Sequence, residues 1–97
     1  MSDLSFEWDE KKSRVNQIKH GVSFEEASTV FFDSNAKLIP DLDHSVDEER
    51  FILLGISTRL KVLVVCHCYR SRPDIIRIIS ARKASKFEEN QYAGGSK

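Results

Sequence analysis

The chain has 97 residues, of which 40% are hydrophobic and 31% are charged, and its formal net charge at pH 7 is zero. This length predicts one small domain, and the composition is that of an ordinary globular protein. No apolar run reaches the roughly 18 residues of a membrane-spanning helix, and the first residues lack the basic and apolar regions of a signal peptide. We therefore expect a cytoplasmic protein that does not bind membranes.

Charge is strongly segregated along this neutral chain. Residues 1–49 carry five basic and twelve acidic side chains, a net charge of −7, whereas residues 50–97 carry ten basic and three acidic ones, a net charge of +7. Clustered Lys and Arg side chains create a local positive potential that attracts phosphates. The second half is therefore the expected phosphate-binding half.

The first elements expected are a short strand and a helix. Residues 5–8 alternate polar and apolar side chains, which is typical of a short strand at a sheet edge. Asp9 is positioned to cap a helix over residues 10–20, and Gly21 to end it. The apolar residues spaced for one face of this helix are Trp8, Val15 and Ile18.

A second helix has the clearest start signal in the chain. Ser23 and Glu26 match a capping box, and Val22 is spaced to pack on Ala27 as a hydrophobic staple. This helix is expected to begin at residue 24 and to end at residue 31 or 32. Its expected core-facing residues are Phe24, Ala27, Val30 and Phe31.

Short strands dominate the rest of the chain. The sequence predicts strands over residues 37–40, 50–57, 61–69 and 75–81, with an acidic connection over residues 41–49. The short spacings between the last three strands favour antiparallel hairpins over crossover helices. A last helix is expected over residues 84–92, with Ser85 as an alternative N-cap, followed by a flexible tail over residues 93–97.

This order of elements predicts an α+β fold with two N-terminal helices, an antiparallel β-sheet meander and a C-terminal helix. Residues 1–92 are expected to form a single domain, with the helices on one face of the sheet. The strands are apolar on both alternations. Either a partner or ligand therefore covers the second face, or the strands are central.

The two cysteines lie two residues apart in a predicted strand. Cys66 and Cys68 would share a face, at a spacing along one extended chain that suits a disulfide poorly. We expect two reduced, buried thiols. His67 would point to the opposite face, so the sequence predicts no metal site here.

Four separated motifs, in register, resemble the BrnT family, whose members are toxins of type II toxin–antitoxin modules. The motifs are Phe6-Glu7-Trp8-Asp9, Lys19-His20-Gly21-Val22-Ser23-Phe24-Glu25-Glu26-Ala27, Asp43-His44-Ser45 with Glu49-Arg50, and Arg77 to Ala84. The resemblance covers roughly residues 6–92. It implies a RelE-like ribonuclease fold and RNA cleavage that inhibits translation, without a metal or other cofactor.

The resemblance also implies a protein partner. A BrnA-type antitoxin would neutralise the toxin in a hetero-oligomer with two toxin copies, and DNA would be bound only through the antitoxin. The acidic first half and the second apolar face of the strands are two candidate surfaces for this partner.

The chain departs from the family pattern at two places. Leu60 stands where a turn glycine is common, and a non-glycine residue is strained at positive φ, so we expect another turn geometry. The last helix is less basic than in relatives, which lowers its expected share in RNA binding.

Metal-free RNA cleavage sets the requirements for the site. The 2′-hydroxyl attacks its own phosphate, so a base must take its proton, cations must stabilise the phosphorane, and an acid must protonate the leaving 5′-oxygen. Arginine suits the second role because its planar fork holds two phosphate oxygens. We expect Arg77 and Arg82 to flank a groove at the sheet, and His67 to act as the acid or base. Tyr92 is the fourth catalytic candidate, as a proton donor or by stacking on a base.

The positive half also supplies the candidates for RNA binding. They are Arg50, Arg59, Lys61, Arg70, Ser80 and Lys83. Simple strand alternation places Arg77 with Ile79 and Ala81 on one face of the last strand. It places Ser80 and Arg82 on the other face, so the two candidate arginines need not point the same way.

Each candidate has a structural alternative that the sequence leaves open. An arginine can be a solvated charge or part of a surface ion pair. His67 can be a packed histidine satisfied by a backbone carbonyl, and Tyr92 can anchor the last helix. His20 is adequately explained as a cap of the first helix and is not part of the predicted site.

Two functions are consistent with this pattern. The leading hypothesis is a metal-independent endoribonuclease with the toxin role described above. The alternative is a non-catalytic protein-interaction subunit of a DNA-bound repressor complex, in which the basic surface meets an acidic partner or the DNA backbone.

Overall fold

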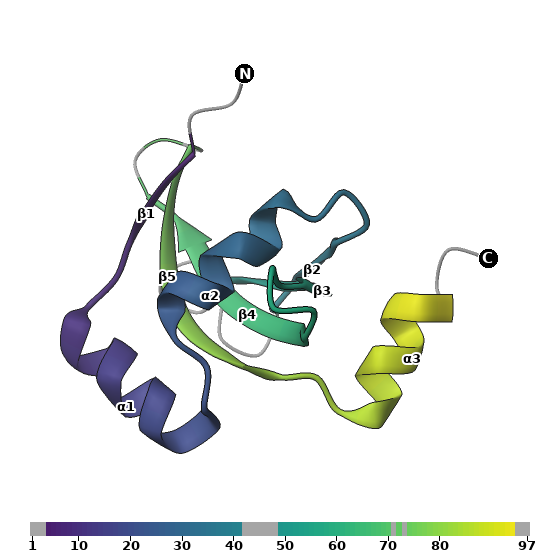
Figure 1. Cartoon of the computed structure of the whole chain (residues 1–97). Helices are drawn as coiled ribbons and strands as arrows, with labels where there is room; N and C mark the ends of the chain where they lie inside the picture. Colours follow the sequence, from purple (N-terminus) through teal and green to yellow (C-terminus); the bar gives the residue numbers. More distant parts are fainter. Residues whose placement is uncertain (1–3, 42–48, 71, 73, 95–97) are drawn as a thin grey trace.

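The structure is a computed structural model that describes residues 4–41, 49–70, 72 and 74–94. Its elements follow the order expected for an α+β fold, which is confirmed (Figure 1). They are β1 (Ser5–Glu7), α1 (Glu10–His20), α2 (Phe24–Thr29), the 3-10 helix η1 (Val30–Phe32), β2 (Lys37–Pro40), β3 (Phe51–Ile56), β4 (Val62–Tyr69), β5 (Ile75–Lys83) and α3 (Lys86–Gly94). The expected acidic connection lies outside the described residues except at its ends, Asp41 and Glu49.

The strands form one sheet in the order β1-β5-β4-β3-β2. The strands β2 to β5 are antiparallel to their neighbours, which confirms the predicted meander. β1 adds to the sheet in parallel with β5, with Phe6 opposite Ile76. As expected, β1 lies at a sheet edge. The chain then runs through α1, α2 and η1 to β2 at the opposite edge, and the meander from β2 to β5 leads back to β1.

Local capping explains where α1 and α2 begin and end. The Asp9 carboxylate accepts hydrogen bonds from the amides of Lys11 and Lys12, and Gly21 ends α1 with a φ of 72°. The Ser23 hydroxyl accepts from the amide of Glu26 at 3.0 Å, as a capping box requires. The Glu26 side chain completes no box, however, because it accepts a hydrogen bond from the Ser57 hydroxyl instead.

The hydrophobic core lies between one face of the sheet and the segment of α2 and η1. It contains Val22, Phe24, Ala27, Val30, Leu53, Leu63, Val65, Ile76, Ile78 and Ala81. The predicted inner face of the second helix is thereby confirmed, although the last turn is a 3-10 helix. At Gly55 the backbone lies so close to this segment that an added Cβ would be 2.8 Å from Val30.

Of the apolar face predicted for the first helix, Trp8 packs against the core but the two residues within the helix do not. Val15 and Ile18 are 60% and 87% exposed, whereas Ser13 and Asn16 are the buried residues of α1. α1 packs along β5 through this polar face because Asn16 hydrogen bonds to the strand backbone. Hydrophobic spacing therefore predicted the wrong inner face.

A β-bulge corrects the predicted alternation of β5. Ser80 lies opposite Cys66, but Ile78 lies opposite His67, so Ile79 is the extra residue of β5. Ala81 consequently joins Ile76 and Ile78 in the core instead of sharing a face with Arg77. Register then places Arg77, Ser80 and Arg82 together on the second face, which we term the open face.

The expectation that all helices cover one face of the sheet is wrong for α3. Figure 1 shows it well separated from α1 and α2, and its residues Phe87 and Gln91 line a hollow with Ile52, Leu54 and Val64 of the open face. α3 includes Ala93 and Gly94, which were expected in the tail. No helix among the described residues is long and apolar enough to span a membrane.

The turn between β3 and β4 keeps a left-handed residue. Leu60 has a φ of 62°, so the expectation of another turn geometry is wrong. A β-carbon is strained in this conformation, which explains why glycine suits the position.

Candidate active site

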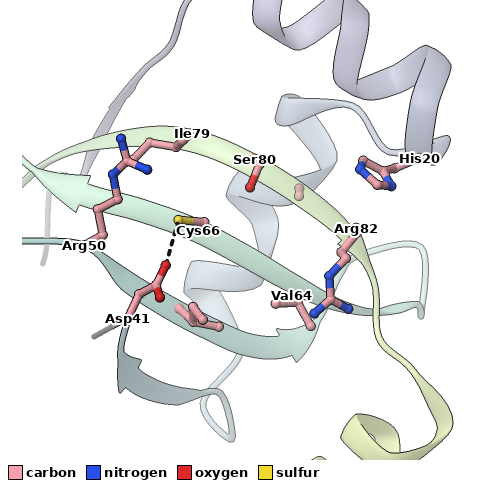
Figure 2. A pocket seen from close by; sticks show the side chains of 10 residues that line it. His20, Asp41, Arg50, Val64, Cys66, Ile79, Ser80 and Arg82 are labelled. Atoms are coloured by element: carbon pink, nitrogen blue, oxygen red, sulfur yellow. Dashed lines mark hydrogen bonds between the residues drawn. The ribbon is translucent and has the colours of Figure 1, made fainter. Parts of the chain in front are cut away.

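Side chains from five segments surround a hollow of about 400 Å³ on the open face (Figure 2). Arg50 precedes β3, Ser80 and Arg82 lie on β5, and His20 is the last residue of α1. The hollow's full lining is His20, Asp41, Arg50, Ile52, Val64, Cys66, Ile79, Ser80, Ala81 and Arg82. Three predicted site residues, Arg50, Ser80 and Arg82, are therefore brought together.

The bulge of β5 shapes this hollow. Ser80 lies opposite Cys66, and Arg82 lies opposite Val64, so both side chains share the open face. Figure 2 shows Arg50 and Arg82 toward opposite ends of the hollow, with Ser80 between them. Cationic groups at both ends of an apolar floor suit a ligand with spread negative charge, such as a phosphodiester.

Asn16 holds the strand at this point. Its side-chain amide donates to the carbonyl oxygens of Ala81 at 2.8 Å and Val22 at 2.9 Å. Its carbonyl accepts a 3.1 Å hydrogen bond from the Ala81 amide. Because β1 pairs only with residues 75–77 of β5, Asn16 replaces a strand neighbour for Ala81, the residue between Ser80 and Arg82.

His20 enters the site from α1. It is half-buried and lines the hollow beside Ser80, and Figure 2 shows it near Arg82. Sequence reasoning missed this residue because helix capping explained it. Its position next to Gly21, within a motif shared with the family, was the available signal.

Arg82 is held by a carboxylate of α3. Its two terminal nitrogens lie 2.8 and 2.9 Å from the two carboxylate oxygens of Glu88, a bidentate ion pair. This hydrogen bonding lowers the pKa of Glu88 to about 2 and raises the pKa of Arg82. Glu88 also accepts from the amide of Ser85, whose hydroxyl accepts from the Glu88 amide, so the pair lies at a capping box.

The cysteine of the hollow remains a thiol. Burial, followed by the nearby Asp41 carboxylate, raises the pKa of Cys66 to about 11. The thiol donates weakly to Asp41 across 3.8 Å. Both Cys66 and Cys68 are free, as predicted, but only Cys68 is buried and Cys66 is half-buried. A protonated thiol is a poor nucleophile.

His67 does not reach the hollow. Its side chain is fully buried on the core side, 4.7 Å from the Phe31 ring and 5.3 Å from the Tyr69 ring between centroids. Its Nδ1 lies 3.3 Å from the carbonyl oxygen of Val65, and its Nε2 has no hydrogen-bond partner among the described residues. Burial lowers the pKa of His67. This is the packed histidine that the sequence left open, rather than an accessible acid or base.

Two other predicted catalytic residues lie outside the hollow. Arg77 pairs with Glu7 at 3.4 Å, and Glu7 also pairs with Arg70 at 3.2 Å. The Tyr92 hydroxyl donates to Asp33 at 2.6 Å, which raises the pKa of Tyr92 to about 12. Tyr92 thus anchors α3, the alternative that the sequence also left open.

The other predicted RNA-binding residues are dispersed. Arg59 and Lys61 flank Leu60 in the β3–β4 turn, and Arg59 lines a separate hollow with Glu25 and Glu26. Lys83 is exposed at the end of β5. Among the described residues there is no group of three or more His, Cys, Asp or Glu side chains arranged to hold a metal ion.

Comparison with known proteins agrees with this fold and with the motifs. Residues 8–88 match the family model described as the ribonuclease toxin, BrnT, of type II toxin–antitoxin systems. The chain also resembles the crystal structure of the Brucella abortus ribonuclease toxin BrnT, with a TM-score of 0.65 and 26% sequence identity. That match covers 87% of this chain and 100% of the Brucella chain. No curated protein matches this chain.

Proposed function

The chain belongs to the BrnT family of ribonuclease toxins of type II toxin–antitoxin systems, and we propose that the hollow around Ser80 is its RNA-cleaving site. The observation that carries this proposal is the convergence of Arg50, Arg82 and His20 on one hollow, from segments far apart in the sequence. Cations and an imidazole are the groups that phosphodiester cleavage needs.

The proposed reaction is an internal transfer at phosphorus. The RNA 2′-oxygen forms a bond to the adjacent phosphorus while the bond from phosphorus to the 5′-oxygen breaks. The 2′-proton passes to a base, and a proton from an acid goes to the 5′-oxygen, which leaves a cyclic 2′,3′-phosphate and a 5′-hydroxyl. No metal enters these steps, because protein cations stabilise the phosphorane.

Each lining residue has a role in this proposal. Arg82 and Arg50 neutralise the phosphorane oxygens, and the Ser80 hydroxyl donates to one of them. His20 transfers a proton as the base or the acid of these steps, a role that imidazole side chains commonly take in enzymes. The fork of Arg82 is occupied by Glu88 in the structure, so RNA must displace that carboxylate.

The test is RNA cleavage by partner-free protein in the presence of EDTA, with analysis of the product ends. We expect cyclic phosphate ends, and losses of about 10²–10³-fold in His20→Ala and Arg82→Ala. The matched variants are Arg77→Ala, Tyr92→Phe and His67→Phe, which remove the predicted catalytic residues that lie outside the hollow. Full activity in both His20→Ala and Arg82→Ala would overturn the site.

The same experiment separates the two function hypotheses. Cleavage that stops in EDTA and returns with a divalent ion would contradict the metal-free mechanism. RNA binding without any turnover would favour the non-catalytic interaction subunit. Toxicity makes cell-free synthesis the practical source of protein.

We further propose that cleavage inhibits translation and that a BrnA-type antitoxin neutralises the toxin in the cytoplasm. Family membership supports a protein antitoxin, because type II modules pair a toxin with one. The proposed complex contains two toxin copies and reaches DNA through the antitoxin. Light scattering of the co-expressed pair measures the stoichiometry, and one toxin per complex would contradict it.

A further inference from the structure

We propose that the groove between α1 and β5 binds the phosphodiester backbone of single-stranded RNA and guides it into the hollow. Lys12 and Lys19 are the principal contacts. This inference rests on the proposed function, because it extends the same site along the substrate. It assigns RNA binding to a helix in the acidic half of the chain, where the sequence predicted none.

The groove adjoins the proposed site directly. It has a volume of about 320 Å³ and is lined by Lys11, Lys12, Val15, Asn16, Lys19, His20, Ile79 and Ser80. Three of these residues, His20, Ile79 and Ser80, also line the hollow. A strand of RNA with a phosphate at Ser80 therefore has a continuous path onto α1.

The charge of α1 is complementary to a phosphate backbone. Residues 11–20 contain four Lys or Arg side chains and no acidic one, within a half whose net charge is −7. Lys12 and Lys19 are seven residues apart, or roughly 10 Å along the helix axis. Two cations at this spacing along one groove can each contact a different phosphate of the same RNA strand.

The lysines at the start of α1 are not explained by a contribution to helix stability. Lys11 and Lys12 lie in the first turn of α1, at the positive end of the helix dipole, where cations are disfavoured. No ion pair involves Lys11, Lys12 or Lys19 within the part of the chain that the structure describes. Their ammonium groups are therefore available to a ligand.

The exposed apolar residues of α1 fit the same ligand. Val15 lines the groove between the lysines although it is 60% exposed. An aliphatic side chain between cations can pack on a ribose or base while the cations hold the phosphates. An acidic, apolar protein segment is the competing occupant, but continuity with the phosphate site favours RNA.

The experiment compares two double variants that remove the same charge from inside and outside the groove. Lys12→Gln/Lys19→Gln removes two cations from the groove, and the control Arg14→Gln/Lys86→Gln removes two exposed cations that do not line it. The probe is a 15-nucleotide 2′-O-methyl oligouridylate, which cannot be cleaved because it lacks a free 2′-hydroxyl. Binding is measured by fluorescence anisotropy at several salt concentrations, after circular dichroism has verified the fold of each variant.

We expect the groove variant to bind at least tenfold more weakly than the wild type at low salt. Its log–log salt slope should fall by about 1.4, which corresponds to two lost phosphate contacts on a single strand. The control variant should bind within twofold of the wild type. Equal losses in both variants, or no loss in the groove variant, would overturn the inference.

Two further outcomes separate this inference from the proposed function and from a protein partner. Normal oligonucleotide binding by the groove variant, together with cleavage abolished in Arg82→Ala, would refute the groove and leave the active site standing. Weakened binding by the groove variant in a protein without ribonuclease activity would support the groove alone. Loss of antitoxin binding with unchanged oligonucleotide binding would show a protein-docking face and overturn the inference.

Discussion

Asn16 is the residue on which the geometry of the site depends most. One side-chain amide satisfies both backbone groups of Ala81, and it also binds the carbonyl of Val22. Backbone groups that are buried without a partner are costly, so this position tolerates few side chains. The neighbouring residues Ser80 and Arg82 keep their orientation only while β5 is held here.

Replacing Asn16 by Ala should therefore weaken both stability and activity. We expect the free energy of unfolding to fall by about 2–4 kcal/mol, because three hydrogen bonds of a buried amide are lost. Urea unfolding measures this change. Gln17→Ala is the control, since its side chain is exposed on the same helix. If Asn16→Ala is as stable as the control, the amide does not hold β5.

The ion pair between Glu88 and Arg82 bears on how phosphate reaches the site. Glu88→Gln keeps the capping box, which accepts glutamine, but removes the charge that occupies the arginine fork. We expect the affinity for the 2′-O-methyl oligonucleotide to rise about two- to five-fold, as the loss of an exposed ion pair suggests. Glu89→Gln removes the same charge from the next residue and should change little. A weaker affinity in Glu88→Gln alone would indicate that Glu88 positions Arg82 instead of competing with phosphate.

At the scale of the elements, local sequence signals predicted well which helices form and where they begin and end. Asp9 and Gly21 lie at the two ends of α1, and Ser23 is the N-cap of α2, as predicted. These positions were predictable because capping depends on a few neighbouring residues. Which face packs was less predictable. α1 is attached by the amide of Asn16, and a pattern of apolar residues carries no information about such a contact.

The contact between β3 and η1 gives a test at this scale. An added Cβ at Gly55 would lie 2.8 Å from Val30, 2.9 Å from Ala36 and 3.0 Å from Asp33. We expect Gly55→Ala to lower the free energy of unfolding by about 1–3 kcal/mol, the usual cost of overpacking. Thermal unfolding measures the change. The control is Gly94→Ala, where no atom lies within 4 Å of the added carbon; equal effects would contradict a close approach at Gly55.

At the scale of the whole molecule, the fold brings together cations that the sequence separates. Arg50 and Arg82 were predicted from the positive half, whereas the cations of α1 were hidden in the negative half. The bulge at Ile79 was also unpredictable, because Ile78 and Ile79 are identical side chains and nothing in the sequence marks one of them as the extra residue. These two facts account for most of the difference between the predicted and the observed site.

Below neutral pH, the free energy of unfolding should decrease as the pH falls. Hydrogen bonds lower the pKa of Asp9 and of Glu88, and those from Tyr92 and the backbone outweigh burial to lower the pKa of Asp33. Burial lowers the pKa of His67 below its ordinary value of 6.5. For every such group the unfolded chain binds protons first as pH falls. The contribution of these groups to stability is therefore fully present above about pH 6.5. As the pH falls, stability declines first because His67 is protonated in the unfolded chain, and then, below about pH 4.5, because the carboxylates are.

Replacing His67 by Phe isolates the first part of this decline. The variant removes the buried Nε2 and leaves an aromatic ring between Phe31 and Tyr69. We expect the melting temperature of the wild type to fall between pH 6.5 and 5, and that of His67→Phe to stay nearly constant over this range. The carboxylate decline below about 4.5 should persist in both proteins. If the two proteins lose stability in parallel from pH 6.5 to 5, His67 is not the group that titrates. RNA cleavage retained by the same variant would identify this histidine as part of the core and leave the proton transfer to His20.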